Sequence, residues 1–209
     1  MTFKNYKLIV SFLLIFMASD SELGAQKFET FGVFGLNAAQ IDGDTHGGYN
    51  KLGFTGGIKT LYDFNDGWAG GIELLFSQRG SQAELVIGSS GFQSKIHLNY
   101  IEIPIYGLYR MLYNTEREYY VLSFHLGLSY GRLLNVSISD DSQFSGLLDG
   151  FKDHDFSYIF GASYATSRKI VITGRFTRAF TYLFKDPRPG LDVDALQGFF
   201  LTFRIEYQF

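Results

Sequence analysis

The sequence predicts an all-β protein, an eight-stranded antiparallel transmembrane β-barrel of the up-and-down type. Three observations lead to this prediction. Apolar and polar residues alternate over long stretches, short polar connections alternate with long ones, and the 209 residues include many strand formers, with 22 Phe, 14 Tyr and 24 Gly. Several alternating stretches reach about ten residues or more, which exceeds the usual length in soluble sheets and suits a tilted strand that crosses a bilayer.

Composition excludes several classes of function. Eighteen basic residues against 21 acidic ones give a formal charge of −3, so there is no basic excess for binding nucleic acid. The absence of Cys excludes disulfides, thiolate metal sites and a lipid-modified N-terminal Cys. A mean hydropathy of +0.02 together with 18% aromatic residues is typical of strands that are apolar on one face and polar on the other.

Residues 1–25 have the three parts of a secretory signal peptide, and residues 26–209 form the predicted outer-membrane barrel domain. Two lysines precede an apolar run over residues 8–18, and cleavage is expected after Ala25. This run of about 11 residues is well short of the roughly 20 that a spanning helix needs, which disfavours an uncleaved anchor. No later stretch approaches 18 apolar residues, so a mature chain that stays in a membrane must do so as a closed barrel.

The alternation places the strands, and it is clearest near the C-terminus, where apolar side chains occupy every second position up to Phe209. We expect strands at about 28–39, 52–64, 68–79, 96–113, 118–132, 155–166, 169–183 and 196–209. Long loops are expected at about 40–51, 80–95, 134–154 and 184–196, and short turns at about 63–67, 114–117 and 166–168. The first strand is the least regular, because Phe31 and Val33 do not fit the same alternation as Phe34.

Short turns on one side and long loops on the other are typical of outer-membrane barrels, whose short turns lie in the periplasm. An even number of strands then puts both termini in the periplasm. Aromatic residues gather at the predicted strand ends, as at Trp68 and Tyr109, where they suit a girdle at the membrane interface. The expected surroundings are the lipid bilayer and lipopolysaccharide.

The rows opposite the apolar ones should face the lumen, and they carry both signs of charge. The expected lumen charge network consists of Lys59, Glu73, Glu102, Arg110, Arg175, Arg204 and Glu206. An eight-stranded barrel is just wide enough for its own side chains, so these charges should pair, fill the lumen and leave no solute-sized pore. A charged selectivity path is the alternative, but it requires a wider barrel or rings of one sign.

The sequence offers two weak indications of chemistry. His125 faces inward near Ser123 and Ser129, an arrangement that a lipid hydrolase could use, but a hydrogen-bonded lumen histidine is the favoured interpretation. Five acidic residues and one histidine gather at and after the third long loop: Asp140, Asp141, Asp149, Asp153, His154 and Asp155. Their spacing matches no calcium loop. We therefore expect no catalytic residue, no metal site and no cofactor.

Three motifs in order along the chain carry a resemblance: GYNKLGF at residues 48–54, ELLFSQRG at 73–80 and LNYIEIP at 98–104. Together they resemble the PorT-like outer-membrane β-barrel family, small barrels of the OmpA and OmpX kind. The resemblance implies an outer-membrane barrel of about eight strands. The founding member of that family is linked to protein secretion across the outer membrane, and most relatives have no assigned activity.

These observations favour a non-enzymatic integral outer-membrane barrel that acts through its loops or turns. The expected partners are proteins of secretion or envelope assembly. The alternative is a small outer-membrane channel or ligand carrier, which measurable single-channel conductance would favour.

Overall fold

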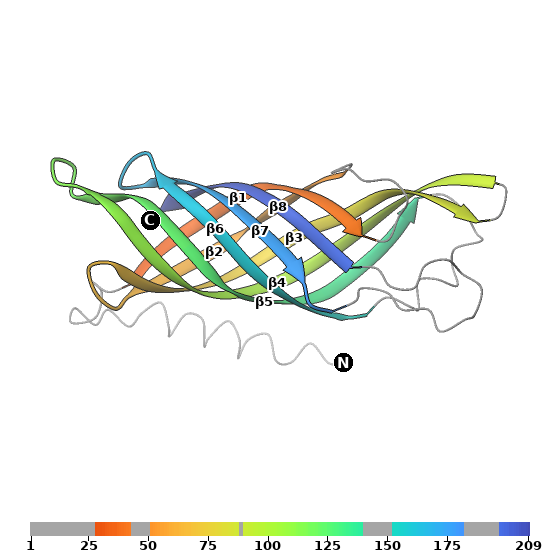
Figure 1. Cartoon of the computed structure of the whole chain (residues 1–209), viewed down its shortest axis with the longest axis horizontal. Coiled ribbons are helices and arrows are strands. Elements are labelled where there is room, and N and C mark those ends of the chain that lie inside the picture. Colours follow the sequence, from red (N-terminus) through yellow and green to blue (C-terminus); the bar gives the residue numbers. More distant parts are fainter. Residues whose placement is uncertain (1–27, 43–50, 88–89, 140–151, 182–196) are drawn as a thin grey trace, which may run out of the picture.

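The computed structural model describes residues 28–42, 51–87, 90–139, 152–181 and 197–209. Eight strands close into a barrel (Figure 1). They are β1 (Phe28–Asp42), β2 (Lys51–Asp63), β3 (Trp68–Ile87), β4 (Ser90–Asn114), β5 (Tyr119–Ser139), β6 (His154–Ala165), β7 (Ile170–Ala179) and β8 (Gln197–Gln208). The expected signal peptide lies outside the described residues. Within the described ranges, no helix is long and apolar enough to span a membrane.

Every strand pairs antiparallel with the next one in sequence, and β1 pairs with β8 to close the barrel. This is the predicted eight-stranded up-and-down topology, and closure leaves the barrel without an edge strand. The irregular first strand now has an explanation. Phe31 and Val33 point into the lumen and are only 4% and 5% exposed, whereas Phe34 is 66% exposed on the outer face.

The two faces of the wall differ as the alternation predicts. On β8, Phe203 and Ile205 are exposed on the outside, while Thr202, Arg204 and Glu206 between and beside them are buried inside. The same division holds on β3, where Ile72 and Leu74 are exposed and Glu73 is buried. An apolar outer face around a polar interior is the arrangement that a lipid bilayer requires.

Strands β3, β4 and β5 are longer than predicted, with 20, 25 and 21 residues. The prediction of a loop at 80–95 is wrong, because β3 and β4 stay paired through their backbones from Gly80 with His97 to Ile87 with Ser90. The loop expected at 134–154 likewise begins later, since β5 continues to Ser139. Gly and Ser in these stretches suggested loops, but pairing with a neighbouring strand satisfies their backbone groups equally well. The β3–β4 hairpin projects at the end opposite the C-terminus (Figure 1).

The short turns lie at the same end as the C-terminus (Figure 1), and two are closed by an Asn side chain. Asn65 Oδ1 accepts hydrogen bonds from the backbone N–H groups of Gly67 and Trp68, at 3.1 and 3.0 Å. Asn114 Oδ1 does the same for Glu116 and Arg117. An Asn that bonds to the backbone two and three residues ahead stabilises a tight turn.

Aromatic rings surround the short-turn end in contacting pairs. Trp68 lies 4.8 Å from Tyr109 between ring centroids, and Phe28 lies 5.0 Å from Tyr62. A further pair follows on β4 and β5, and another at the C-terminus. Such rings suit a membrane interface, because the ring can contact lipid while its polar edge stays wet.

A charge placed on the outer face tests this division of the wall. Phe203→Arg should lower the free energy of unfolding by about 2–4 kcal/mol if the position lies near the bilayer midplane. The matched control is Thr202→Ser, one residue away on the lumen side. It keeps the hydroxyl that donates to Asn37 at 2.9 Å and should cost about 1 kcal/mol or less. Urea unfolding in lipid vesicles, followed by the fluorescence of the single Trp68, measures both; equal losses would contradict the assignment of the faces.

Candidate functional site

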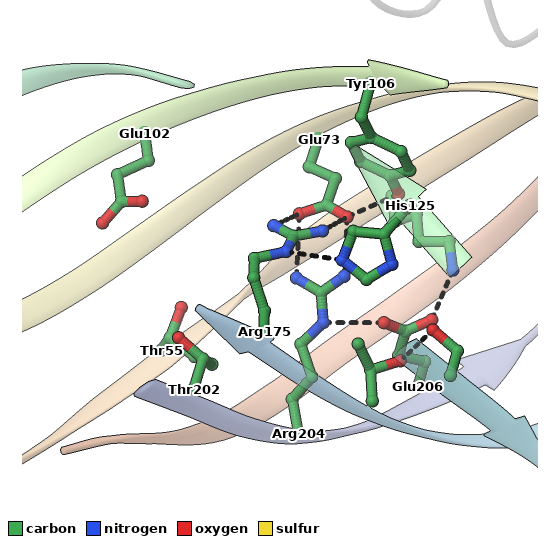
Figure 2. A network of polar contacts seen from close by, with 12 residues as sticks. Thr55, Glu73, Glu102, Tyr106, His125, Arg175, Thr202, Arg204 and Glu206 are labelled. Atoms are coloured by element: carbon green, nitrogen blue, oxygen red, sulfur yellow. Dashed lines mark hydrogen bonds and ion pairs between the residues drawn. The ribbon is translucent and has the colours of Figure 1, made fainter. Parts of the chain in front are cut away.

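The middle of the lumen is occupied by a carboxylate held between two arginines (Figure 2). Glu73 accepts two hydrogen bonds from Arg175, both at 2.8 Å, and two from Arg204, at 2.9 and 2.7 Å. The Tyr106 hydroxyl donates a fifth to Glu73 at 2.6 Å. Glu73 is only 2% exposed and both arginines are at most 4% exposed, so this is a buried and fully paired site.

A second carboxylate extends the cluster toward β2. Arg204 Nε lies 2.7 Å from one carboxylate oxygen of Glu206, and the Lys59 ammonium pairs with the other. We call Lys59, Glu73, Arg175, Arg204 and Glu206 the central cluster. It joins three cations to two carboxylates, so its formal charge is +1. Its members come from β2, β3, β7 and β8, which links opposite walls of the barrel.

Glycines on the inward rows make room for these large side chains. A Cβ on Gly71 would lie 2.4 Å from the Tyr106 ring, and a Cβ on Gly161 would lie 2.6 Å from His125 Nε2. Both distances are too short for a real contact. The absence of a side chain at these positions therefore lets Tyr106 and His125 cross the lumen to the central cluster.

His125 packs against this cluster as a hydrogen-bond acceptor. Arg175 Nε donates to His125 Nε2 at 3.1 Å, which assigns the ring proton of the neutral imidazole to Nδ1. The Tyr106 ring lies 5.2 Å from the imidazole. Within the described residues, the buried hydroxyl of Ser129 has no hydrogen-bond partner, so it makes no pair with His125. Arg175 also occupies the imidazole nitrogen that would have to accept a proton from a catalytic serine.

Toward the long-strand end, Arg79 joins two more carboxylates. It lies 2.7 Å from Glu102 and 2.6 Å from Asp155, and its guanidinium covers the Phe200 ring at 4.2 Å. Phe200, an apolar residue on the otherwise polar inward row of β8, thus points inward to pack on a cation. We call Arg79, Glu102 and Asp155 the outer cluster. Its Glu102 stands apart from the central cluster (Figure 2).

Toward the short turns, Arg110 forms a third cluster. It contacts both oxygens of Asp63, at 3.0 and 2.9 Å, and Glu29 at 2.7 Å. We call Glu29, Asp63 and Arg110 the inner cluster. The outer and inner clusters each hold one cation and two carboxylates, for a formal charge of −1. Among the described residues, the lumen charges therefore alternate along the barrel axis as −1, +1 and −1.

The seven residues expected in the lumen all face inward, but the structure distributes them over three separate clusters. Sequence reasoning missed four partners: Glu29, Asp63, Arg79 and Asp155. Asp63 and Arg79 follow the same inward alternation, so the pattern could have identified them. Glu29 lies on the irregular first strand.

The described part of the predicted acidic loop is divided between the two faces of the wall. Asp155 points into the lumen and pairs with Arg79 at 2.6 Å, whereas Asp153 pairs with Arg132 on the outside at 2.9 Å. Asp140, Asp141 and Asp149 lie outside the described residues. In the part of the chain that is described, no three His, Asp or Glu side chains are grouped to hold a metal ion.

A cavity of about 520 Å³ lies between the central cluster and the short turns. Its lining includes Glu29, Lys59, Arg110, Tyr119 and Ser163. Lys59 belongs to the central cluster, so the cavity ends where the paired charges cross the lumen. We call it the inner cavity.

A closed barrel with an apolar outer face and a charged, paired interior defines an integral outer-membrane β-barrel protein. The comparison with family models agrees. The model described as "Outer membrane protein beta-barrel domain" matches residues 24–185, and the chain belongs to this family of outer-membrane proteins. No curated protein matches the sequence.

Solved structures share the fold at low sequence identity. The chain is similar to Ail, the attachment invasion locus protein of Yersinia pestis, solved in complex with the heparin analogue sucrose octasulfate, with 14% identity and a TM-score of 0.50. That match covers 88% of this chain and 99% of Ail. OprG from Pseudomonas aeruginosa matches at 13% identity and a TM-score of 0.46, over 88% of this chain and 95% of OprG.

Removing the central carboxylate tests how far the lumen depends on it. Glu73→Gln leaves two buried guanidinium groups facing a neutral amide and should lower the free energy of unfolding by about 3–5 kcal/mol. The control is Glu118→Gln, which removes an ion pair to Arg168 in which both side chains are at least 60% exposed and should cost below about 1 kcal/mol. Urea unfolding in vesicles compares them, and a loss for Glu73→Gln as small as that of the control would contradict a central role for Glu73.

Proposed function

We propose that this protein is a non-enzymatic outer-membrane barrel, closed to solutes, that acts through partner contacts at its ends. The observation that carries the proposal is the central cluster, in which Glu73, Arg175 and Arg204 meet across the lumen with at most 4% exposure. A structural role for His125 is supported by its bond from Arg175. Release of fatty acid from lipids by the wild type, lost in a folded His125→Ala variant, would contradict the proposal.

The partners we propose are proteins of secretion or envelope assembly, reached from the periplasm. This orientation, with both termini and the short turns in the periplasm, is supported by the contrast between tight turns at one end and long strands at the other. The PorT-like resemblance supports the link to secretion. Two of its motifs contain Glu73, Arg79 and Glu102, which build the lumen clusters, so these motifs support a shared barrel construction more directly than a shared partner.

Purification in mild detergent from the native outer membrane tests the partner contact. A tagged wild type should retain secretion or periplasmic scaffold proteins in a fixed ratio. Because contacts are proposed at the short turns, the double variant Asp66→Lys, Glu116→Lys should lose them while the barrel remains folded. Lys152→Glu, on the opposite rim, is the matched control and should retain them. A folded wild-type barrel that purifies alone would contradict the proposed role.

The closed lumen has its own test in planar bilayers. The wild type should give no stable single-channel conductance, because the paired side chains of the central cluster leave no water-filled path through the middle of the barrel. Reproducible conductance steps from the purified wild type would contradict a closed lumen and favour the channel alternative.

The inner cavity favours a second candidate function, that of a ligand carrier. Its volume of about 520 Å³ suits a small molecule, and its lining combines charged groups with aromatic side chains such as Tyr113 and Tyr119. A carrier would co-purify with a small molecule that is lost when Ser163→Phe fills the cavity. A partner-binding barrel would retain its partner proteins in that variant.

A further inference from the structure

The outer face of the wall carries an apolar hollow over β4, β5 and β6 with a volume of about 640 Å³. Its lining includes Ile105, Gly107, Leu128, Tyr130 and Phe156. The hollow exists because Gly107 lies on the lipid-facing row without a side chain, and a Cβ built there meets no atom within 4 Å. Neighbouring residues on the same row, such as Ile105 at 60% exposure, form its walls.

A polar cluster adjoins this hollow at its long-strand side. The Tyr130 hydroxyl lies 2.7 Å from His154 Nδ1, and Arg132 donates to His154 Nε2 at 2.6 Å. Tyr130 lines the hollow as well, and its ring packs against Phe156 at 5.3 Å and against His154 at 5.8 Å. A single aromatic side chain thus connects an apolar groove to a group of polar and cationic side chains.

Arg132 is the cation of this cluster, and it pairs with one carboxylate, Asp153, at 2.9 Å. Arg132 is 45% exposed, so its guanidinium remains accessible on the outer face. A guanidinium group is suited to hold a phosphate, and the hollow beside it is suited to hold a hydrocarbon chain.

We propose that the hollow and the polar cluster form one binding site for a phosphorylated lipid. An acyl chain lies in the hollow over Gly107, and the phosphate contacts Arg132, which His154 positions by accepting its hydrogen bond at 2.6 Å. The site does not depend on the proposed protein partners or on a closed lumen. With the short turns in the periplasm, the long-strand end faces outward, and the ligand is then a lipid of the outer leaflet.

Lipid retention in nanodiscs tests the site with the full mature barrel. The probe is lipid A in a phosphatidylcholine bilayer, supplied with its phosphates or enzymatically dephosphorylated, and native mass spectrometry after ejection counts the lipid that stays bound. The wild type should retain phosphorylated lipid A at about tenfold or higher occupancy over the dephosphorylated form, because charged hydrogen bonds to the phosphate are lost. Equal retention of both forms would overturn the proposal.

Variants separate the two halves of the site. Gly107→Leu fills the hollow without a clash in the protein and should reduce retention of both forms of lipid A. The matched control is Gly174→Leu on β7, also on the lipid-facing row, where an added Cβ makes an ordinary 3.9 Å contact. This control should retain lipid as the wild type does. Equal behaviour of the two glycine variants would overturn the assignment of the acyl chain.

For the headgroup, Arg132→Gln with His154→Gln should abolish the preference for phosphorylated lipid. Asp153→Asn should instead increase the retention of phosphorylated lipid, because it releases Arg132 from its ion pair. A purely structural role of the cluster predicts no such gain, so reduced or unchanged retention in a folded Asp153→Asn variant would contradict the proposed phosphate contact. Heat-dependent mobility on gels confirms that each variant is folded.

Discussion

The ion pairs of Glu73 with Arg175 and Arg204 are the interaction on which the interior depends. An eight-stranded barrel leaves a lumen of roughly side-chain width, so its charged residues cannot remain hydrated as they would on a surface. A buried charge without a partner is costly, whereas a carboxylate that accepts five hydrogen bonds is compensated. The bonds join β3 to β7 and β8 across the lumen, and they hold opposite walls at a fixed separation.

The alternation of charge along the axis follows from the same constraint. Glu73 and Glu206 leave the central cluster one positive charge in excess, and the outer and inner clusters on either side are each one negative charge in excess. In a medium of low effective dielectric, opposite excesses at short range attract. An alternation of sign along the axis is therefore electrostatically favourable, whereas three excesses of the same sign would repel one another.

The fold could be predicted from the sequence because period-two alternation fixes both the strands and their faces. The alternation of apolar and polar residues fails at Phe31, because part of the lumen near the short turns is itself apolar. Phe31 packs there with Leu61 and Leu108. An apolar side chain that faces this part of the lumen cannot be distinguished from one that faces lipid. The ion-pair partners could not be predicted from the sequence either. The contact of Arg175 with Glu73 across the lumen depends on strand tilt and stagger, which alternation alone does not determine.

Residues paired inside the lumen and residues on the accessible surfaces have different roles, and this difference limits where a partner can bind. Glu73, Arg79 and Glu102, from the motifs that carry the family resemblance, are engaged in ion pairs inside the lumen. A residue buried in a paired cluster is not available to bind a partner. What distinguishes this barrel from others with the same interior must therefore lie on its accessible surfaces: the short turns with the inner cavity at one end, the long strands at the other, and the lipid-facing wall. Differences between relatives in function should follow differences at these surfaces, while the central cluster serves the barrel itself.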